Sequence, residues 1–403
     1  MNLKELQLID NSDVRKIIRD NREEDPLKFA LRYNRKKEFP VRAIAEQIKC
    51  YQKAKRKLPL LSNSDFIFES VSLEQASSEA TAKFKAGIIN GKILIDLTGG
   101  LGIDSIHFAG KFEKVFYCEE NSLLYELFLR NFKTLGINNI EAFEEDGTEI
   151  LKSYPDKYFN WIYVDPSRRD SNKRLVGLEN CWPNVIANLD LYLQKSQNIL
   201  IKASPALDYK KVKEQLPLLN RFVAVSVDGE CKEILLFTTA QEGLCVTSIE
   251  AAVLDGEGSL TFHLSTSEID VIEKKISKEV RQYFYEPDAA IIKTGLSPKV
   301  AAQNELWFIN HSIDYITADE FIPAFPGRSF QVVLSSVYNK RKMKEYLSSN
   351  GIISANIARR DFPDSPEEIR SNLKLKDGGK DYLFFTKNSV NDLIFIHCKK
   401  PEI

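Results

Sequence analysis

Four acidic residues stand at or just after the ends of four successive apolar runs between residues 92 and 166. Asp96 ends "KILID", Glu119 follows "KVFYC", Asp146 follows "IEAFEE" and Asp165 follows "NWIYV". Because the carboxyl ends of parallel strands meet at one edge of a sheet, these carboxylates are expected to lie together. Each acid alone could equally be a helix cap. Four in succession favour a ligand site lined by acids.

The first of these acids opens a glycine-rich stretch, "DLTGGLGID", which joins a predicted strand to a predicted helix. Its three glycines would let the backbone approach a ligand where a side chain would clash. The alternative is that they only pack the turn. A dinucleotide-binding fingerprint fits less well, because Ser105 stands where a third glycine is expected. The candidate ligand-binding positions in this stretch are Asp96, Thr98, Gly99, Gly100, Gly102 and Asp104.

Two arginines, Arg168 and Arg169, follow the fourth acid in "VDPSRRD". A guanidinium plane stacks on nucleobases and also forks onto phosphate, so both are candidate substrate-binding residues. The structural alternative is that they pair with nearby acids such as Asp170 or Glu179. Lys202, at the end of the next apolar run, is a further candidate for the same site.

Short apolar strands that alternate with helices must position these residues. The first five predicted strands are separated by helical segments, which indicates parallel pairing with crossover helices. The last two are separated only by "DGECK", which predicts an antiparallel hairpin. The fold class is therefore α/β, with a Rossmann-like sheet of seven strands. The predicted strands are 92–98, 114–120, 140–146, 160–166, 198–204, 221–227 and 233–239.

Helices are expected before this sheet and small α+β modules after it. One helix signal, at 72–89, carries Ser72 as a possible cap with Gln75 three residues later. After about residue 245 come a probable hairpin and a mixed region, and then a segment that alternates strand and helix. The expected division is a helical region (1–90), a Rossmann-like domain (91–245), a region with a hairpin and mixed elements (246–326) and a C-terminal α+β domain (327–403).

The composition excludes several classes of protein. The net charge is -1, so a role with nucleic acid must depend on local basic runs such as "KAKRK", "NKRKMK" and "ARRD". The six cysteines lack CxxC spacing and the four histidines lie far apart, so we expect no metal site and a reducing compartment. The sequence shows neither a signal peptide nor an apolar run long enough to span a bilayer. We therefore expect a cytosolic protein that does not associate with a membrane.

The strand ends and the glycine-rich stretch together resemble the class I S-adenosylmethionine-dependent methyltransferases. The resemblance implies that S-adenosylmethionine is the cofactor, with its methionine part beside Asp96 and the glycines. It further implies that Glu119 holds the ribose, that Asp146 receives the adenine amine, and that Asp165 faces the methyl acceptor. The closing hairpin corresponds to the antiparallel seventh strand of that fold.

A narrower resemblance covers nearly the whole chain. It rests on "LEQASSEATAKFKA", "DLTGGLGIDS", "VDPSRRD", "IKASPALD", "YEPDAAIIKTGL", "FPGRSF" and "RRDFPDSPEEIRSNLKLKDGGKDYLFFT". In combination these motifs resemble the bacterial methyltransferases that carry a ferredoxin-like insert and a C-terminal THUMP-like domain. Since THUMP domains are associated with RNA, the resemblance implies RNA modification and RNA binding.

The nature of the acceptor follows from the fourth strand end. Methyltransferases that modify exocyclic amines of bases commonly end this strand in DPPY or NPPY, where the aromatic ring stacks the base. Here the expected catalytic positions keep the polar acceptors and lose the aromatic, which arginine can partly replace. We therefore expect the acceptor to be a base in tRNA or rRNA. The four positions are Asp165, Pro166, Ser167 and Arg168.

Three other interpretations are open at this point. Cys181, in "LENCWP", could attack a base covalently, although it does not adjoin a proline in the usual order. The near-zero net charge is compatible with a methyltransferase of a small molecule or a protein. A non-catalytic RNA-binding protein that kept the cofactor fold would bind the cofactor without turnover.

Overall fold

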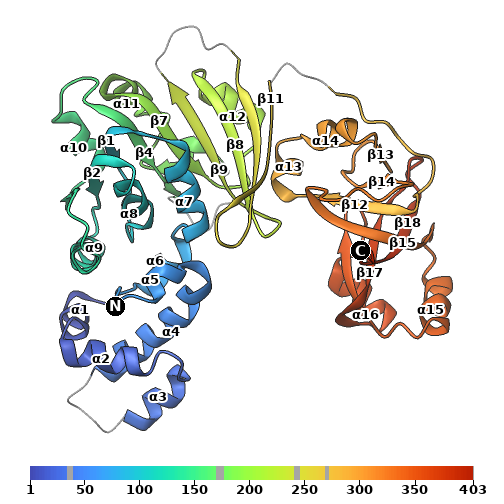
Figure 1. Ribbon diagram of the computed structural model, residues 1–403, viewed down its shortest axis with the longest axis horizontal. Coiled ribbons are helices and arrows are strands. Elements are labelled where there is room, and N and C mark those ends of the chain that lie inside the picture. Colours follow the sequence, from blue (N-terminus) through green and yellow to red (C-terminus); the bar gives the residue numbers. More distant parts are fainter. Residues whose placement is uncertain (34–39, 169–176, 240–245, 268–271, 403) are drawn as a thin grey trace. The chain divides into compact units, whose positions relative to one another are not determined.

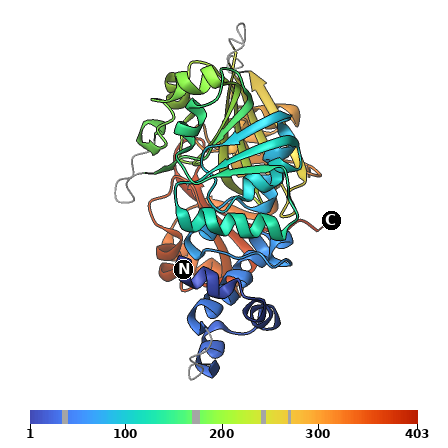
Figure 2. The ribbon, with the colours of Figure 1, turned by 90° about the vertical axis from the view of Figure 1, so that its left-hand side faces the viewer.

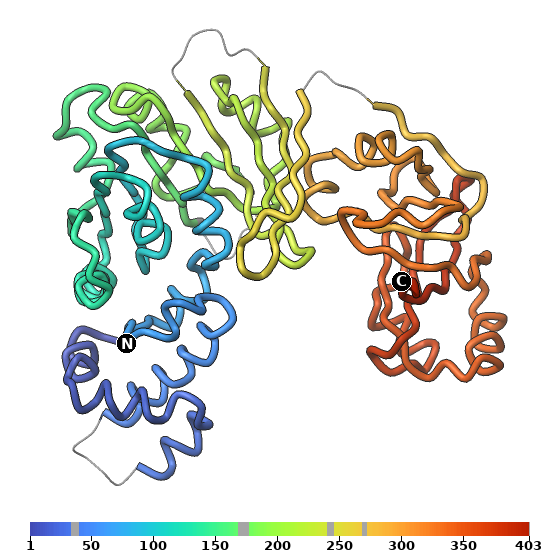
Figure 3. Tube along the Cα trace, viewed as in Figure 1, coloured from blue at the N-terminus to red at the C-terminus, as the bar shows by residue number. Residues whose placement is uncertain are grey.

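The computed structural model describes residues 1–33, 40–168, 177–239, 246–267 and 272–402, and of Arg168 only the backbone. These residues form two compact units, each described below by itself. Figure 3 follows the chain through them from the N-terminus. The first unit comprises residues 1–228, 232–250 and 254–261, and the second comprises 229–231, 251–253 and 262–403.

A nine-stranded sheet organises the first part of the chain, with the strand order β11-β10-β8-β9-β7-β4-β1-β2-β3 (Figure 1). Strands β3, β2, β1, β4 and β7 pair in parallel, and β9 pairs antiparallel to β7. Figure 2 views the unit from the side of β2. The strands are β1 (Gly91–Asp96), β2 (Phe112–Cys118), β3 (Ile140–Phe143), β4 (Phe159–Val164), β7 (Ser196–Ala203), β8 (Leu219–Val227), β9 (Glu230–Thr239), β10 (Ser248–Leu254) and β11 (Leu260–Ser267).

The predicted α/β fold class is confirmed, and so are all seven predicted strands. The expected closing hairpin is β8 and β9, joined by Asp228 and Gly229, both with positive φ (51° and 79°) as a type I′ turn requires. The sheet differs from the expectation in its width, because β10 and β11 extend the seven expected strands to nine.

Five helices connect the strands of this sheet, and the helical N-terminal region packs on two of them. Buried side chains of the N-terminal region, among them Leu6 and Ile48, share one core cluster with Leu101, Ile103 and Leu127. Fully burying such a side chain contributes about 1.5–3 kcal/mol. The connecting helices are α8 (Ile103–Ala109), α9 (Ser122–Thr134), α10 (Gly147–Lys152), α11 (Leu189–Lys195) and α12 (Tyr209–Gln215); the N-terminal ones are α1 (Leu3–Ile9), α2 (Ser12–Asp20), α3 (Pro26–Tyr33), α4 (Val41–Lys57) and α5 (Pro59–Ser62).

The single helix expected at 72–89 is instead two helices, α6 (Ser70–Gln75) and α7 (Glu79–Ile88), so the prediction of Ser72 as its cap was wrong. Glu69 caps α6 and accepts the N–H of Ser72, while Ser78 caps α7. Each of these side-chain bonds satisfies one free N–H group of a helix start, which favours the break.

Two glycines after β1 pack on a pair of stacked aromatic rings. The rings of Tyr117 and Phe128 lie 3.7 Å apart between centroids and are nearly parallel (7°). A Cβ atom on Gly99 would lie 2.1 Å from the Tyr117 ring, and one on Gly102 would lie 2.3 Å from the Phe128 ring. The packing interpretation of the glycine-rich stretch therefore holds for these two positions.

The second unit is built on a seven-stranded sheet with the order β13-β14-β12-β15-β18-β17-β16. Its C-terminal part contains the expected alternation of strand and helix, and α15 and α16 bury Met343, Leu347 and Ile369 in one core cluster. The strands are β12 (Tyr283–Pro287), β13 (Trp307–Phe308), β14 (Ile316–Ala318), β15 (Gly327–Val337), β16 (Ser354–Arg359), β17 (Lys376–Lys387) and β18 (Leu393–Lys399). The helices are α13 (Ala289–Lys293), α14 (Ser297–Gln303), α15 (Lys340–Ser349) and α16 (Pro366–Leu373).

Replacing Gly102 with alanine is expected to destabilise the first unit more than the same change at Gly136. Both glycines have positive φ (76° and 68°), which costs an alanine about 1–2 kcal/mol. Only at Gly102 would the new methyl also overlap a ring, which adds about 1–3 kcal/mol. Urea unfolding followed by circular dichroism measures both variants. Equal shifts of the unfolding midpoint would contradict the packing role of Gly102.

Candidate functional site

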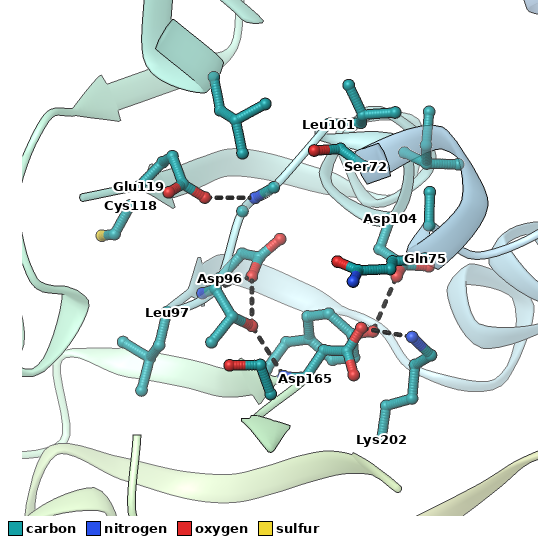
Figure 4. Close-up of a pocket in the computed structure, with 18 of the residues that line it drawn as sticks. Ser72, Gln75, Asp96, Leu97, Leu101, Asp104, Cys118, Glu119, Asp165 and Lys202 are labelled. Carbon is teal, nitrogen blue, oxygen red and sulfur yellow. Dashed lines mark hydrogen bonds and ion pairs between the residues drawn. The ribbon is translucent and has the colours of Figure 1, made fainter. Parts of the chain in front are cut away.

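A cavity of about 750 Å³ opens at the carboxyl ends of β1, β2, β4 and β7 (Figure 4). In this view Glu119 and Lys202 lie on opposite sides, with Asp96 between them. The four predicted acids all line this cavity, as the strand-end argument expected. The lining residues are Ser72, Gln75, Ala76, Ser77, Asp96, Leu97, Thr98, Gly99, Gly100, Leu101, Ile103, Asp104, Cys118, Glu119, Glu120, Leu124, Asp146, Tyr163, Asp165, Ser167, Trp182, Pro183 and Lys202.

Glu119 fixes the glycine-rich stretch from the end of β2. Its Oε2 accepts the N–H of Gly100 at 2.8 Å, and its Oε1 accepts the N–H of Asn121 at 2.8 Å. Burial raises the pKa of Glu119, although these two N–H groups oppose the rise. A carboxylate that already accepts two hydrogen bonds keeps free lone pairs, so it can still receive hydroxyl donors of a ligand.

Asp146 combines the two roles that the sequence left open. Its Oδ1 accepts the N–H of Thr148 at 2.7 Å, which makes it the N-cap of α10. It also lines the cavity. The helix-cap interpretation and the ligand interpretation are therefore compatible at this position.

Asp96 is almost completely buried, with 1% of its surface exposed. Its Oδ2 accepts the Ser105 hydroxyl at 2.6 Å, and its Oδ1 accepts the N–H of Thr98 at 3.0 Å. Burial raises the pKa of Asp96 to about 7 against the effect of these bonds, and the charges of Asp104 and Asp165 add to the rise. Ser105, which argued against a dinucleotide site, thus holds this carboxyl group.

One hydroxyl joins the end of β1 to the end of β4. The backbone N–H of Asp165 donates to Oγ1 of Thr98 at 2.7 Å. The Asp165 side chain forms an ion pair with Lys202. Burial alone would lower the pKa of Lys202, but Asp165, Glu233 and Asp104 together raise it above its usual value. Lys202 is therefore a charged side chain inside the cavity, paired with the predicted catalytic acid.

A buried ion cluster lies behind Asp104. Lys85 of α7 is fully buried, and its Nζ lies 2.7 and 2.9 Å from the carboxylate oxygens of Glu233 and 3.3 Å from Oδ1 of Asp104. Oδ2 of Asp104 accepts the hydroxyls of Ser77 and Tyr163, each at 2.8 Å. Burial opposes ionisation of Asp104, but Lys85, Lys202 and these hydroxyls hold its pKa below the usual value.

Most of this cluster was not predicted from the sequence. A lysine in a predicted helix is normally taken as exposed. The available signal was its spacing, since Lys85 follows Ala82 by three residues and precedes Ile89 by four, and both neighbours are buried. Glu233 begins an apolar strand run, where a buried acid also needs a partner.

Ser167 and the pair Trp182–Pro183 also line the cavity. A short hairpin of β5 (Ser167–Arg168) and β6 (Cys181–Trp182) pairs Ser167 with Trp182. Pro166 is half-buried and is not part of the described lining. The predictions for the Arg168 side chain, for Arg169 and for their pairing with Asp170 lie outside the described residues, while Glu179 accepts a hydrogen bond from Gln215.

The thiols do not favour covalent chemistry. Cys181 lies next to Trp182, but it is not among the residues found to line the cavity. Cys118 does line it, and burial raises its pKa well above the usual value, which disfavours a thiolate.

Within the described ranges there is no cluster of histidine, cysteine and acids that would hold a metal ion. No helix in the same ranges is long and apolar enough to span a membrane.

The residues of the cavity fit S-adenosylmethionine. That cofactor presents an ammonium group, a sulfonium, ribose hydroxyls and an adenine amine, all of which are cations or hydrogen-bond donors. The cavity offers carboxylates for them. In addition, Oδ1 of Asp104 is buried and accepts no hydrogen bond within the described part of the chain. The residues that would hold the cofactor are Asp96, Thr98, Gly99, Gly100, Asp104, Glu119 and Asp146.

Comparisons with known proteins agree with the fold and with the cofactor. Residues 327–400 match the family model described as THUMP domain-like. Two Mycobacterium tuberculosis proteins, from strains CDC 1551 and H37Rv, are each 22% identical over 319 residues, which is 79% of this chain and 84% of theirs. Both are described as uncharacterized S-adenosylmethionine-dependent methyltransferases.

Among solved structures, a candidate methyltransferase of Porphyromonas gingivalis W83 is similar over 100% of both chains, with a TM-score of 0.83 and 26% identity. The expectation of a class I S-adenosylmethionine-dependent methyltransferase with a C-terminal THUMP-like domain is confirmed, and with it the reaction class and the cofactor.

Replacing Asp96 with asparagine is expected to remove a pH dependence of stability. Because the pKa of Asp96 is raised to about 7, the folded protein keeps a proton that the unfolded chain releases, so the stability contributed by Asp96 falls as pH rises from about 4 to about 7. The fall is on the order of 1.4 kcal/mol per pKa unit. Asparagine mimics the protonated form, so the stability of D96N relative to wild type should increase as pH rises over this range.

Thermal unfolding of both proteins between pH 4 and 8 measures this difference. Ser105→Ala is a useful control, because it removes a hydroxyl that favours the ionised form and should extend the fall in stability to higher pH. A stability difference between D96N and wild type that does not change with pH would contradict the assignment.

Proposed function

We propose that this S-adenosylmethionine-dependent methyltransferase methylates a base in RNA, and that the RNA is a tRNA or an rRNA. The observation that carries the proposal is the match of residues 327–400 to a THUMP-like domain, since THUMP domains are associated with RNA.

The proposal includes the domain division expected from the sequence: a helical region, a methyltransferase domain, a ferredoxin-like region and the THUMP-like domain. It also includes a cytosolic location, to which the buried thiols of Cys50 and Cys398 are suited.

The charge distribution supports RNA as the partner of the THUMP-like region. Residues 327–400 carry fourteen lysines and arginines against eight acids, whereas the rest of the chain carries 42 against 49. A cationic segment in an otherwise acidic chain is typical of a local nucleic-acid contact.

Helix α15 concentrates this charge. Four exposed cations occupy its first five positions, and its first turn contains no acid. Cations at a helix N-terminus oppose the helix dipole, so the arrangement costs folding free energy that phosphate groups would recover. Arg341 is paired with Glu345 at 3.1 Å. The four residues are Lys340, Arg341, Lys342 and Lys344.

The cavity supports base methylation through Asp165 and its surroundings. S-adenosylmethionine, when bound, supplies a sulfonium methyl group for in-line displacement, which requires mainly that the acceptor be held in line and in contact. In the proposal Asp165 accepts a hydrogen from the acceptor amine, Lys202 and the N–H bond to Thr98 hold Asp165 in place, and Glu119 and Asp146 bind the cofactor. Arg168, Arg169 and Lys202 remain proposed contacts to the RNA.

Replacing Asp165 with asparagine is expected to slow methyl transfer about 100-fold or more, the size of a typical acid-base or positioning contribution. Affinity for S-adenosylhomocysteine, measured by calorimetry, should change little. Total RNA from a deletion strain and labelled cofactor provide the assay. Asp156→Asn is a matched control, because it also breaks an Asp–Lys pair, at 3.0 Å with Lys195, away from the cavity.

Full activity of D165N would contradict the role of Asp165. Absence of label from every RNA fraction with wild-type protein that binds the cofactor would instead contradict RNA as the acceptor, and would favour a small molecule, a protein or a non-catalytic role.

Replacing Lys342 and Lys344 with alanine is expected to weaken RNA binding and to reduce its salt dependence. Each lost phosphate contact lowers the slope of log K against log salt by about 0.7–0.9. Fluorescence anisotropy with labelled tRNA at several salt concentrations measures both quantities. The control pair is Lys92→Ala with Lys152→Ala, two exposed lysines of the first unit that lie outside the basic runs. Equal slopes for the two double variants would contradict a specific role of α15.

A further inference from the structure

Trp182 is unusual among the large side chains of this protein. It is 41% exposed, and it is the one aromatic residue among the exposed large hydrophobic side chains of the described ranges. The other two tryptophans lie outside the cavity lining. The indole N–H of Trp161 donates to the carbonyl of Asn90 at 2.9 Å, and the guanidinium of Arg281 lies 3.7 Å from the ring centroid of Trp307.

The β5–β6 hairpin places Trp182 beside the reacting end of the site. Trp182 pairs with Ser167, two residues after Asp165, and Oγ of Ser167 lies 3.4 Å from the carbonyl oxygen of Trp182. Asp165, Ser167, Trp182 and Pro183 line the same cavity. A flat apolar side chain therefore lines the same cavity as a carboxylate and a hydroxyl.

This combination selects a particular kind of acceptor. An exposed aromatic side chain lacks the stabilisation that burial provides. That stabilisation is gained when a flat ring of a ligand covers the side chain. The carboxylate of Asp165 accepts hydrogen only from a donor such as an N–H group. A planar ring with an amine on its edge satisfies both, because its flat face can cover the indole while its N–H group reaches the carboxylate.

We propose that Trp182 is the stacking platform for the nucleobase that receives the methyl group, and that it determines specificity for a planar acceptor. This proposal rests on the proposed function of the site and deepens it. The aromatic surface that is missing from positions 165 to 168 is supplied by a residue fourteen positions further along the chain, through the pairing of Ser167 with Trp182.

The test uses the full chain with Trp161 and Trp307 changed to phenylalanine, so that Trp182 is its only tryptophan. Random-sequence single-stranded RNA hexamers are titrated in the presence of saturating S-adenosylhomocysteine. Stacking of a base is expected to quench the fluorescence of Trp182. An abasic ribose-phosphate hexamer of the same charge should leave the fluorescence unchanged, because it offers phosphates without bases.

Two substitutions of Trp182, one aliphatic and one aromatic, then test whether a ring is needed at this position. Measured by fluorescence anisotropy of end-labelled hexamers, Trp182→Leu should weaken hexamer binding by about 5- to 150-fold, the usual effect of removing an aromatic stacking partner. Trp182→Phe, which keeps a ring, should stay within about threefold of wild type. Methyl transfer to RNA should follow the same order, and both variants should bind S-adenosylhomocysteine like wild type.

The outcomes are distinct. If wild type binds the hexamers and transfers methyl groups to RNA, but W182L does so equally well, the role of Trp182 is overturned while the proposed function stands. If wild type binds the cofactor product but neither binds RNA hexamers nor methylates RNA, the proposed function fails and the stacking proposal fails with it.

Discussion

The buried contact between Lys85 and Glu233 is the constraint on which the site depends. Lys85 comes from α7, Glu233 from β9, and their 2.7 Å contact joins a helix that precedes the sheet to its antiparallel strand. A buried charge without a partner is costly, so neither side chain can move away alone. Lys85 also lies beside Asp104, which receives the hydroxyls of Ser77 and Tyr163. The break between α6 and α7, the start of α8 and the end of β4 are thereby held together.

In the proposed function the cavity holds two ligands. Glu119, Asp146 and the glycine-rich stretch would hold the cofactor, and Asp165, Ser167, Trp182 and Lys202, which line the same cavity, would face the methyl acceptor. Thr98 connects them, since its hydroxyl accepts the backbone N–H of Asp165 while its own N–H donates to Asp96. Methyl transfer requires the two ligands to be aligned, and this short path of hydrogen bonds fixes the strand ends that align them.

The sequence was sufficient for the features that follow from strand direction. Asp96, Glu119, Asp146 and Asp165 could be placed together because parallel strands end at one edge. It was insufficient where distant segments meet: no periodicity marks two-residue strands such as β5 and β6, so Trp182 was not predicted at the site. The role of Lys85 depends on Glu233, 148 residues away, and that pairing is a property of tertiary packing. The helix break at Ala76 was missed because Ser78 competes as a cap within an otherwise helical pattern.

The packing of the glycine-rich stretch on two stacked aromatic rings has a thermodynamic consequence. Gly99 and Gly102 rest on Tyr117 and Phe128, and the hydroxyl of Tyr117 donates to the carbonyl of Gly100 at 2.6 Å. The conformational entropy of this stretch is therefore lost during folding and not during ligand association. Cofactor association should then show a heat-capacity change that reflects the surface covered by the ligand alone, without a contribution from ordering the loop.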